Sequence, residues 1–511
     1  MSDPNPSRRS AFQIALSAIE RIGNKVPHPA VLFAGLIVAL VALSAALASA
    51  GVHVTYERIN PETYKFESLT TAVRSLISAE GVRFITTSAV RNFVNFGPVG
   101  IILVAMIGIG VAERSGLIGA IIRKIVQVAP GSWMTGIIVA LGVVSSIASD
   151  AGYLVLIPLG ASAFHSLGRH PLAGLAAAFA GVAAAFGANI LVKPIDGILA
   201  EMTNDALRIV DPSKSISLTA NFYFGVASSV LLIVVCTWVT ARVVEPRLGA
   251  YGGEKSAEDE RGLSADESRG LIYATVAVAV FLGILAWLTL PAGAPMRHPE
   301  TGAIIGDSPF MDSLVFFIMA GFFMAGAAYG VGARTIGSAN AVIQMIVKTF
   351  ADLADLLFLF FVISQFVAYF NFTNIGTIIA VRLAETLKAA DLTSMTLLSA
   401  FIAIGVLMSI PVPNILPKWA ILAPVFVPLF HKLGVAPDVV LAAYRVSDSP
   451  PNVINPLLPH FALVVGFARR WQPDAGVGTI VAMMLPYAAA TMFAWVILFF
   501  AWYLLGIPFG L

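Results

Sequence analysis

Residues 163–171 read AFHSLGRHP, and residues 429–437 read LFHKLGVAP. The two stretches share five residues at a constant offset of 266 (430 − 164 = 266), namely Phe164, His165, Leu167, Gly168 and Pro171 matched with Phe430, His431, Leu433, Gly434 and Pro437. The sequence has 7 histidines, so two of them in one frame indicate an internal repeat rather than chance. We interpret the chain as two copies of one structural unit.

The composition indicates an all-α polytopic membrane protein. Of 511 residues, 58% are hydrophobic and 12% are charged, about half the charged fraction of soluble domains. Several apolar runs reach the roughly 20 residues that cross a bilayer as a helix. The net charge of +2 says nothing about nucleic acid, because the Lys and Arg residues are spread over loops rather than clustered, and we expect no nucleic-acid partner. Cys236 is the single cysteine, so no intrachain disulfide forms.

The apolar runs predict nine transmembrane helices and two re-entrant hairpins. Residues 133–164 and 394–430 are too long for one helix and carry helix breakers at their centres, so we expect each to enter and leave on the same side. The nine expected crossings are 30–50, 96–112, 172–200, 220–241, 271–290, 310–330, 353–389, 437–468 and 478–505.

The distribution of Lys and Arg predicts the orientation. The loops that fall on one side with the N-terminus are rich in Lys and Arg, which places the N-terminus in the cytoplasm. The domains we expect are a cytoplasmic N-terminus (1–29), a first half (30–241), a cytoplasmic linker (242–270) and a second half (271–511). Residues 334–350 have the pattern of an amphipathic helix on the membrane surface. Residues 51–91 give no firm expectation.

In this topology the first hairpin opens from the cytoplasm and the second from outside, so the two copies are inverted. Inverted repeats with broken helices are typical of secondary transporters, which bind substrate and ions near the middle of the membrane. The sequence therefore predicts a carrier.

The hairpin tips hold polar residues. The first tip, VVSSIASDAGY, contains Ser149 and Asp150. Asp150 is either a hard oxygen ligand for a cation or the N-cap of the second half-helix. The second tip, SIPVPNILPKW, places Asn414 among three prolines that should prevent a continuous helix, namely Pro411, Pro413 and Pro417.

Further polar breaks lie in the helices beside the hairpins. They contain Asn189 in GANILVKPIDG, Asn374 in NFTNIGT and Asn455 in VINP. Side-chain oxygens suit small hard cations. We predict a sodium site at Asp150, Asn189, Asn374, Asn414 and Asn455; a buried carboxylate that gains and loses a proton is the alternative.

The stretch YRVSDSPPNVINP contains Arg445 and Asp448 at membrane depth. Spaced i and i+3 on one helical face, they are expected to offset each other's charge. A structural ion pair is the bland interpretation, although ionisable groups inside a membrane are usually functional. Asn452 in the same stretch is a further substrate-binding candidate.

Three long motifs, SSIASDAGYLVLIPLGASAFHSLGRHPLAG, GANILVKPIDG and AYRVSDSPPNVINPLLP, resemble the aminobenzoyl-glutamate transporter (AbgT) family over nearly the whole chain. The resemblance implies a homodimer in the bacterial inner membrane, with nine transmembrane helices, two hairpins, and a scaffold and mobile core of the elevator type. It also implies import of p-aminobenzoyl-glutamate or export of sulfonamide antimetabolites, driven by protons or sodium and without a further cofactor.

The resemblance implies substrate-cavity roles for Asp196, Trp419, Pro437, Arg445, Asp448 and Pro456. These residue types suit the substrate, because Arg445 can grip a carboxylate or sulfonyl group and Trp419 can stack on an aminobenzoyl ring.

Other functions fit the sequence less well. A dicarboxylate carrier of similar architecture is the main alternative, but a small diacid has no ring to stack on Trp419. An enzyme is not expected, since the sequence has no G-x-S-x-G or H-E-x-x-H motif. A channel would need a continuous pore instead of occluding hairpins.

Overall fold

The computed structural model describes residues 28–59, 66–146, 152–251, 263–389 and 393–511. Within these ranges, seven helical segments are long and apolar enough to cross a membrane, which makes the chain a multi-pass membrane protein. The segments are α2 (Pro29–Ser49), α3 with α4 (Ala79–Val94 and Gly97–Arg114), α10 with α11 (Phe222–Val239 and Glu245–Leu248, joined by a π-helical turn), α12 (Ala265–Thr289), α14 (Leu314–Gly332), α16 (Ala354–Thr373) and α22 (Val477–Leu504).

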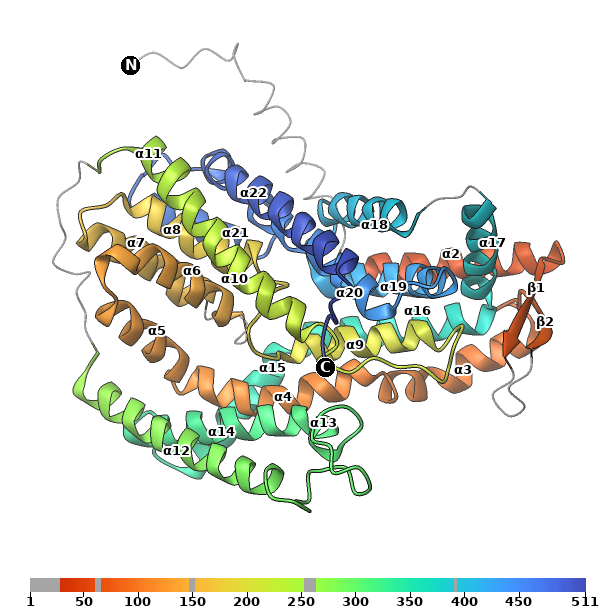
Figure 1. The fold of residues 1–511 in the computed structure, drawn as a ribbon, viewed down its shortest axis with the longest axis horizontal. Helices are drawn as coiled ribbons and strands as arrows, with labels where there is room; N and C mark the ends of the chain where they lie inside the picture. The colour runs from red at the N-terminus through yellow and green to blue at the C-terminus, as the bar shows by residue number, and fades with distance from the viewer. Residues whose placement is uncertain (1–27, 60–65, 147–151, 252–262, 390–392) are drawn as a thin grey trace, which may run out of the picture.

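Three expected crossings are broken in the structure. The crossing predicted at 172–200 is α8 (Pro171–Phe179) with a π-helical turn, a gap, and α9 (Pro194–Leu207). The crossing at 437–468 is α20 (Pro437–Asp448), a 3-10 turn (Pro450–Ile454) and α21 (Phe461–Arg469). In the crossing at 353–389, Asn374 adopts a left-handed φ of 59°, so α16 ends and α17 (Ile375–Ala389) turns away (Figure 1). The polar breaks predicted within these three crossings are therefore confirmed.

Both predicted hairpin segments are helix–break–helix units. The first consists of α6 (Met134–Ser145) and, after the tip, a π-helical turn (Gly152–Leu156) with α7 (Ile157–Ser166). The second consists of α18 (Ser394–Ser409) and α19 (Ile415–Lys432). Pro417 does not break the second unit as predicted: it lies in the first turn of α19, where a missing N–H costs little.

The repeated turn has the same geometry in both copies. Gly168 and Gly434 both adopt left-handed backbones, with φ of 71° and 80°. Arg169 N–H donates to the Phe164 carbonyl at 2.8 Å, and Val435 N–H donates to the Phe430 carbonyl at 2.9 Å. This pattern closes a helix C-terminus and needs glycine at its left-handed position, so the shared glycine has a physical cause.

Residues 51–91, for which the sequence gives no firm expectation, contain a β-hairpin. Strands β1 (His53–Ile59) and β2 (Phe66–Ala72) pair antiparallel, with His53 opposite Ala72. The helix α3 then runs into α4, so the crossing predicted at 96–112 belongs to a longer helical segment. The amphipathic segment 334–350 contains the helix α15 (Ala339–Asp352). Near the predicted linker, α11 ends at Leu248 and α12 begins at Ala265.

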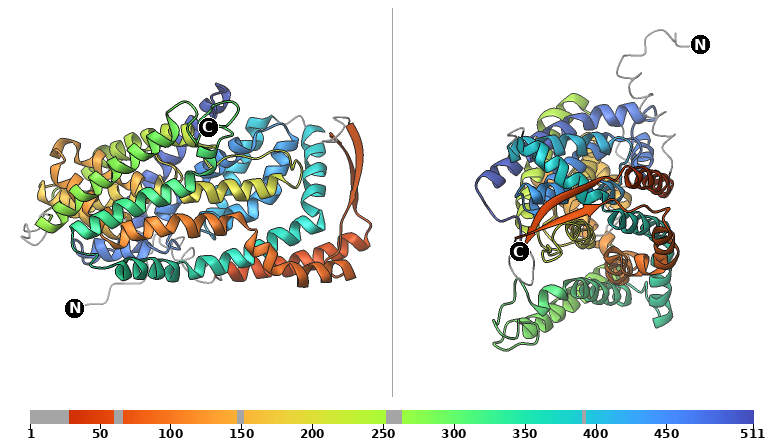
Figure 2. Two further views of the ribbon diagram at one scale, coloured as in Figure 1. Left: turned by 90° about the horizontal axis from the view of Figure 1, so that it is seen from below. Right: turned by 90° about the vertical axis from the view of Figure 1, so that its right-hand side faces the viewer.

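The elements form an elongated body with distinct regions (Figure 1). Helices α6, α7, α8, α10 and α22 gather at one end, and α2, α3, α16, α17 and the β-hairpin lie at the other. The pair α12 and α14 packs along α4 and α5 on one side, which both views of Figure 2 also show. The short helix α13 (Pro309–Asp312) precedes α14, and α5 (Leu117–Val128) turns by 118° into the first hairpin.

Candidate functional site

A cavity of about 340 Å³ lies between the tips of the two hairpins. That volume is at the lower end of the range for drug-sized ligands. Its walls come from both repeats, from α4 and from the start of α16. The residues that line it are Ile102, Met106, Ser146, Tyr153, Phe186, Lys193, Pro194, Ile195, Ile198, Leu353, Leu356, Pro413, Asn414, Ile415, Leu416, Asn452, Leu458, Pro459 and His460.

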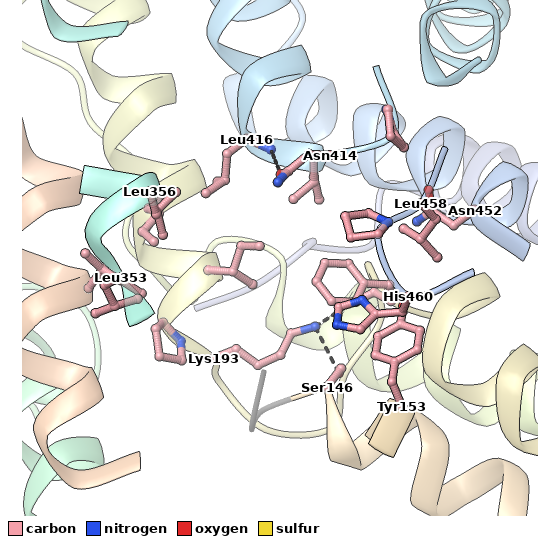
Figure 3. A pocket seen from close by; sticks show the side chains of 18 of the residues that line it. Ser146, Tyr153, Lys193, Leu353, Leu356, Asn414, Leu416, Asn452, Leu458 and His460 are labelled. Carbon is pink, nitrogen blue, oxygen red and sulfur yellow. Dashed lines mark hydrogen bonds between the residues drawn. The ribbon is translucent and has the colours of Figure 1, made fainter. Parts of the chain in front are cut away.

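The cavity has a more apolar and a more polar end. Leu353 and Leu356 lie on one side in Figure 3, while Asn452, His460 and Tyr153 lie on the other. The imidazole of His460 stacks on the Tyr153 ring, with centroids 4.1 Å apart and planes at 10°. This arrangement suits a ligand with a ring at one end and polar groups at the other.

Lys193 brings a buried amine to this cavity. It lies where the broken helix resumes as α9, and its side chain reaches toward His460 (Figure 3). The Lys193 Nζ donates to the Phe186 carbonyl at 2.6 Å and to the Ser146 Oγ at 3.3 Å. Lys193 as a whole is 1% exposed to solvent. The amine is thus held against the first hairpin tip by neutral oxygens.

Two asparagines bind the hairpin tips in the same way. Asn189 Nδ2 donates to the Val143 carbonyl at 3.3 Å and to the Ser146 Oγ at 3.0 Å, and its Oδ1 accepts from Leu191 N–H. Asn455 Nδ2 donates to the carbonyls of Ser409 and Ile410, at 2.6 and 3.3 Å, and its Oδ1 accepts from Leu457 N–H.

The two asparagines are 266 residues apart (455 − 189 = 266), which is the offset of the repeat. Two of their partners match at the same offset: Val143 corresponds to Ser409, and Leu191 corresponds to Leu457. We call this pair of contacts the asparagine clasps. They show that the repeat extends to equivalent hydrogen bonds, well beyond the turn that first indicated it.

The predicted pairing of Arg445 with Asp448 is wrong. Arg445 Nη1 instead contacts Asp196 Oδ1 at 2.6 Å, so this ion pair joins the two halves of the chain. Asp196 also accepts the Lys193 N–H at 2.7 Å, which starts α9. Asp196 and Arg445 line a second cavity of about 20 Å³, which has room for a water molecule and not for an aromatic ring.

Asp448 pairs with Lys418. The Lys418 Nζ lies 2.5 Å from Asp448 Oδ1, and both side chains are 0% exposed. Trp419 is also fully buried, with its ring stacked on Tyr444 at 4.5 Å and its indole N–H donating to the Thr203 Oγ1. In this structure Trp419 faces protein. Its counterpart in the other repeat, Tyr153, is the ring that lines the large cavity.

The remaining predicted residues are dispersed. Asn414 and Asn452 line the large cavity, and Asn414 also caps α19 through Leu416 N–H. Asn374 lies at the β-hairpin, where its Nδ2 donates to the Ala72 carbonyl. Pro437 begins α20, and Pro456 follows the second clasp; neither lines the large cavity.

The predicted sodium ligands that the structure describes make contacts with different elements. Asn189 and Asn455 hold different hairpin tips, and Asn374 is at the β-hairpin. Ser149 and Asp150 lie outside the described residues.

Lys193, Tyr153 and His460 were not predicted from the sequence as site residues. A signal existed for two of them: Lys193 adjoins the polar break at Asn189, and the repeat pairs Tyr153 with Trp419. His460 could not be found this way, because its position follows from the path of the chain after the 3-10 turn.

Known proteins resemble this chain along nearly its full length. The model of the AbgT putative transporter family matches residues 15–511. The p-aminobenzoyl-glutamate transport protein of Escherichia coli (strain K12) is 34% identical over 498 residues, covering 96% of this chain and 95% of that protein.

Two solved structures also match. The YdaH transporter of Alcanivorax borkumensis superposes with a TM-score of 0.89 and 39% identity, covering 95% of this chain and 100% of that one. MtrF of Neisseria gonorrhoeae, described as illuminating a class of antimetabolite efflux pumps, gives a TM-score of 0.88 and 40% identity, covering 96% and 97%. With a family model that matches almost every residue and relatives above 30% identity, this chain belongs to the AbgT transporter family.

Proposed function

We propose that this protein is a cation-coupled secondary active transporter of p-aminobenzoyl-glutamate and related aromatic anions. The observation that carries the proposal is the cavity of about 340 Å³ between two hairpin tips, apolar at one end and polar at the other. The relationship to a p-aminobenzoyl-glutamate transport protein supports this substrate class.

The proposed cycle uses the two hairpins as gates on opposite sides of the cavity. A proton or sodium ion orders the tips so that substrate fits, and the loaded core then moves past the scaffold, as in an elevator. Inverted repeats with broken helices support this mechanism. We further propose a homodimer in the bacterial inner membrane with a cytoplasmic N-terminus.

The apolar end of the cavity favours an aromatic substrate over a simple dicarboxylate. Leu353 and Leu356 offer a surface that a benzene ring would bury and that a small diacid would leave unused. Sulfonamides carry the same aminobenzene ring next to polar oxygens, and a relative is described with antimetabolite efflux pumps. We therefore include sulfonamides among the ligands of this cavity.

The test is flux of labelled p-aminobenzoyl-glutamate in proteoliposomes, with sodium and proton gradients imposed separately. We expect flux to follow one gradient and to disappear in Ile198→Trp, which fills the cavity wall. Ile284→Trp, on an exposed position of α12, is the matched control and should retain wild-type flux. Wild-type vesicles that show no flux under either gradient would refute the proposal.

A further inference from the structure

We propose that Lys193 binds the carboxylate of the substrate, with the first hairpin tip holding its amine in place. The inference deepens the proposed function and rests on it. It assigns the anionic end of the ligand to the polar end of the large cavity and the aromatic ring to the end formed by Leu353 and Leu356.

The buried cations around the site differ in their counter-ions. Lys418 and Arg445 each contact a carboxylate, at 2.5 and 2.6 Å. The Lys193 Nζ, in contrast, has no carboxylate oxygen within 4.0 Å among the residues that the structure describes, although the Lys193 backbone N–H contacts Asp196. A buried charge without a counter-ion is costly, so an anion in the cavity would complete the site.

The Lys193 amine has one more hydrogen-bond donor than the protein uses. An ammonium group has three N–H donors, and two are directed at the Phe186 carbonyl and the Ser146 hydroxyl. The third remains for a ligand in the cavity that Lys193 lines. Because Ser146 belongs to the first hairpin tip, a carboxylate on Lys193 would bind next to the gate itself.

The same cavity also has an unused hydrogen-bond acceptor. Asn452 is 4% exposed, and its Oδ1 has no hydrogen-bond partner in the described part of the chain. Buried acceptors of this kind normally find a partner. An aromatic amide ligand would supply an N–H donor to Asn452, while its carboxylate contacts Lys193. The ligand class is therefore an aromatic amide that ends in a carboxylate.

The experiment compares binding of p-aminobenzoyl-glutamate with binding of its uncharged diamide, which has almost the same shape. In purified wild-type protein we expect the dianion to bind at least about tenfold tighter, as one charge-assisted hydrogen bond allows. Lys193→Gln should reduce that preference to about threefold or less and leave diamide affinity nearly unchanged. Lys193→Arg keeps the charge and should retain most of the preference.

Controls separate this inference from misfolding and from the proposed function. Lys348→Gln, at an exposed lysine of α15, should behave as wild type. Should Lys193→Gln not fold, Asn452→Asp places a negative charge at the same cavity and should weaken dianion binding about tenfold with little effect on the diamide.

A folded Lys193→Gln protein that keeps the wild-type preference, or that loses both ligands equally, would overturn the role of Lys193. Dianion binding that is unchanged in Asn452→Asp would also overturn the role of Lys193. Wild-type protein that neither binds nor transports the dianion would instead overturn the proposed function.

Discussion

In the described part of the chain, two charged residues are 0% exposed, and they pair with each other. Lys418 and Asp448 are fully shielded from solvent and lie 2.5 Å apart. Removing one member of such a pair leaves an isolated charge in an apolar interior, which costs about 3–5 kcal/mol. The pair is therefore expected to specify how α19 and α20 meet.

Asp448→Asn should lower thermal stability strongly, because Lys418 then has no counter-charge. The double variant Lys418→Met with Asp448→Leu should recover most of that stability, since two apolar groups need no pairing. Thermal melting of the detergent-solubilised protein measures both. Glu80→Gln, which breaks the exposed pair with Arg74, is the control and should cost under about 1 kcal/mol. A double variant no more stable than Asp448→Asn would contradict this account.

Some of the site was predictable from single residues, and some was not. Arg445 and Asp448 were recognisable because ionisable groups at membrane depth are conspicuous, and Asp196 followed from the family resemblance. Their partners were not predictable. The i, i+3 spacing suggested that Arg445 pairs with Asp448, whereas in the structure Arg445 pairs with Asp196 and Asp448 pairs with Lys418. Spacing reports neighbours along one helix, and these pairs form between helices.

The asparagine clasps act on whole elements, because each joins a broken helix to a hairpin tip. Asn189→Ala removes the bonds to Val143 and Ser146, and Asn455→Ala removes those to Ser409 and Ile410. Asn189→Ala also leaves the Leu191 N–H without its acceptor, and Asn455→Ala leaves the Leu457 N–H and two carbonyls without these bonds. A buried polar group left unpaired costs about 1–3 kcal/mol.

Hydrogen–deuterium exchange should show this separately for each hairpin. Asn189→Ala should raise exchange in 142–146 and 152–156 and leave 409–416 unchanged, and Asn455→Ala should do the reverse. Asn204→Ala is the control, since Asn204 makes similar paired bonds to Ile216 in a loop far from the tips in sequence. Faster exchange in both hairpins after either single change would show that the clasps are not independent.

Hairpins and apolar helices were predictable because hydrophobic length and proline clusters mark them. The β-hairpin was not, because its strands are short and lie between two strongly helical segments. The break between α16 and α17 was predicted at Asn374, but its cause was not: a left-handed asparagine ends a helix, and the sequence shows the residue without its φ.

Across the whole molecule, transport by a sliding core requires α9 to move relative to α4. These helices are close enough to test it, because a Cβ added at Gly197 would lie 3.3 Å from the Ile101 side chain. Oxidising the pair Ile101→Cys with Gly197→Cys should stop flux, and reduction should restore it. Cys236 is buried, so background crosslinking should be small. The unoxidised pair is the control, and full flux in the crosslinked protein would rule out sliding.

The likeness of the two clasps has a consequence for the direction of transport. Both use one asparagine amide, two donor contacts and one acceptor contact, so they should resist opening to a similar degree. A carrier with evenly matched gates has little built-in bias, and its empty form would divide its time between the two faces of the membrane. Net flow would then be dictated by the gradients outside the protein, so one molecule could run as an importer or an exporter.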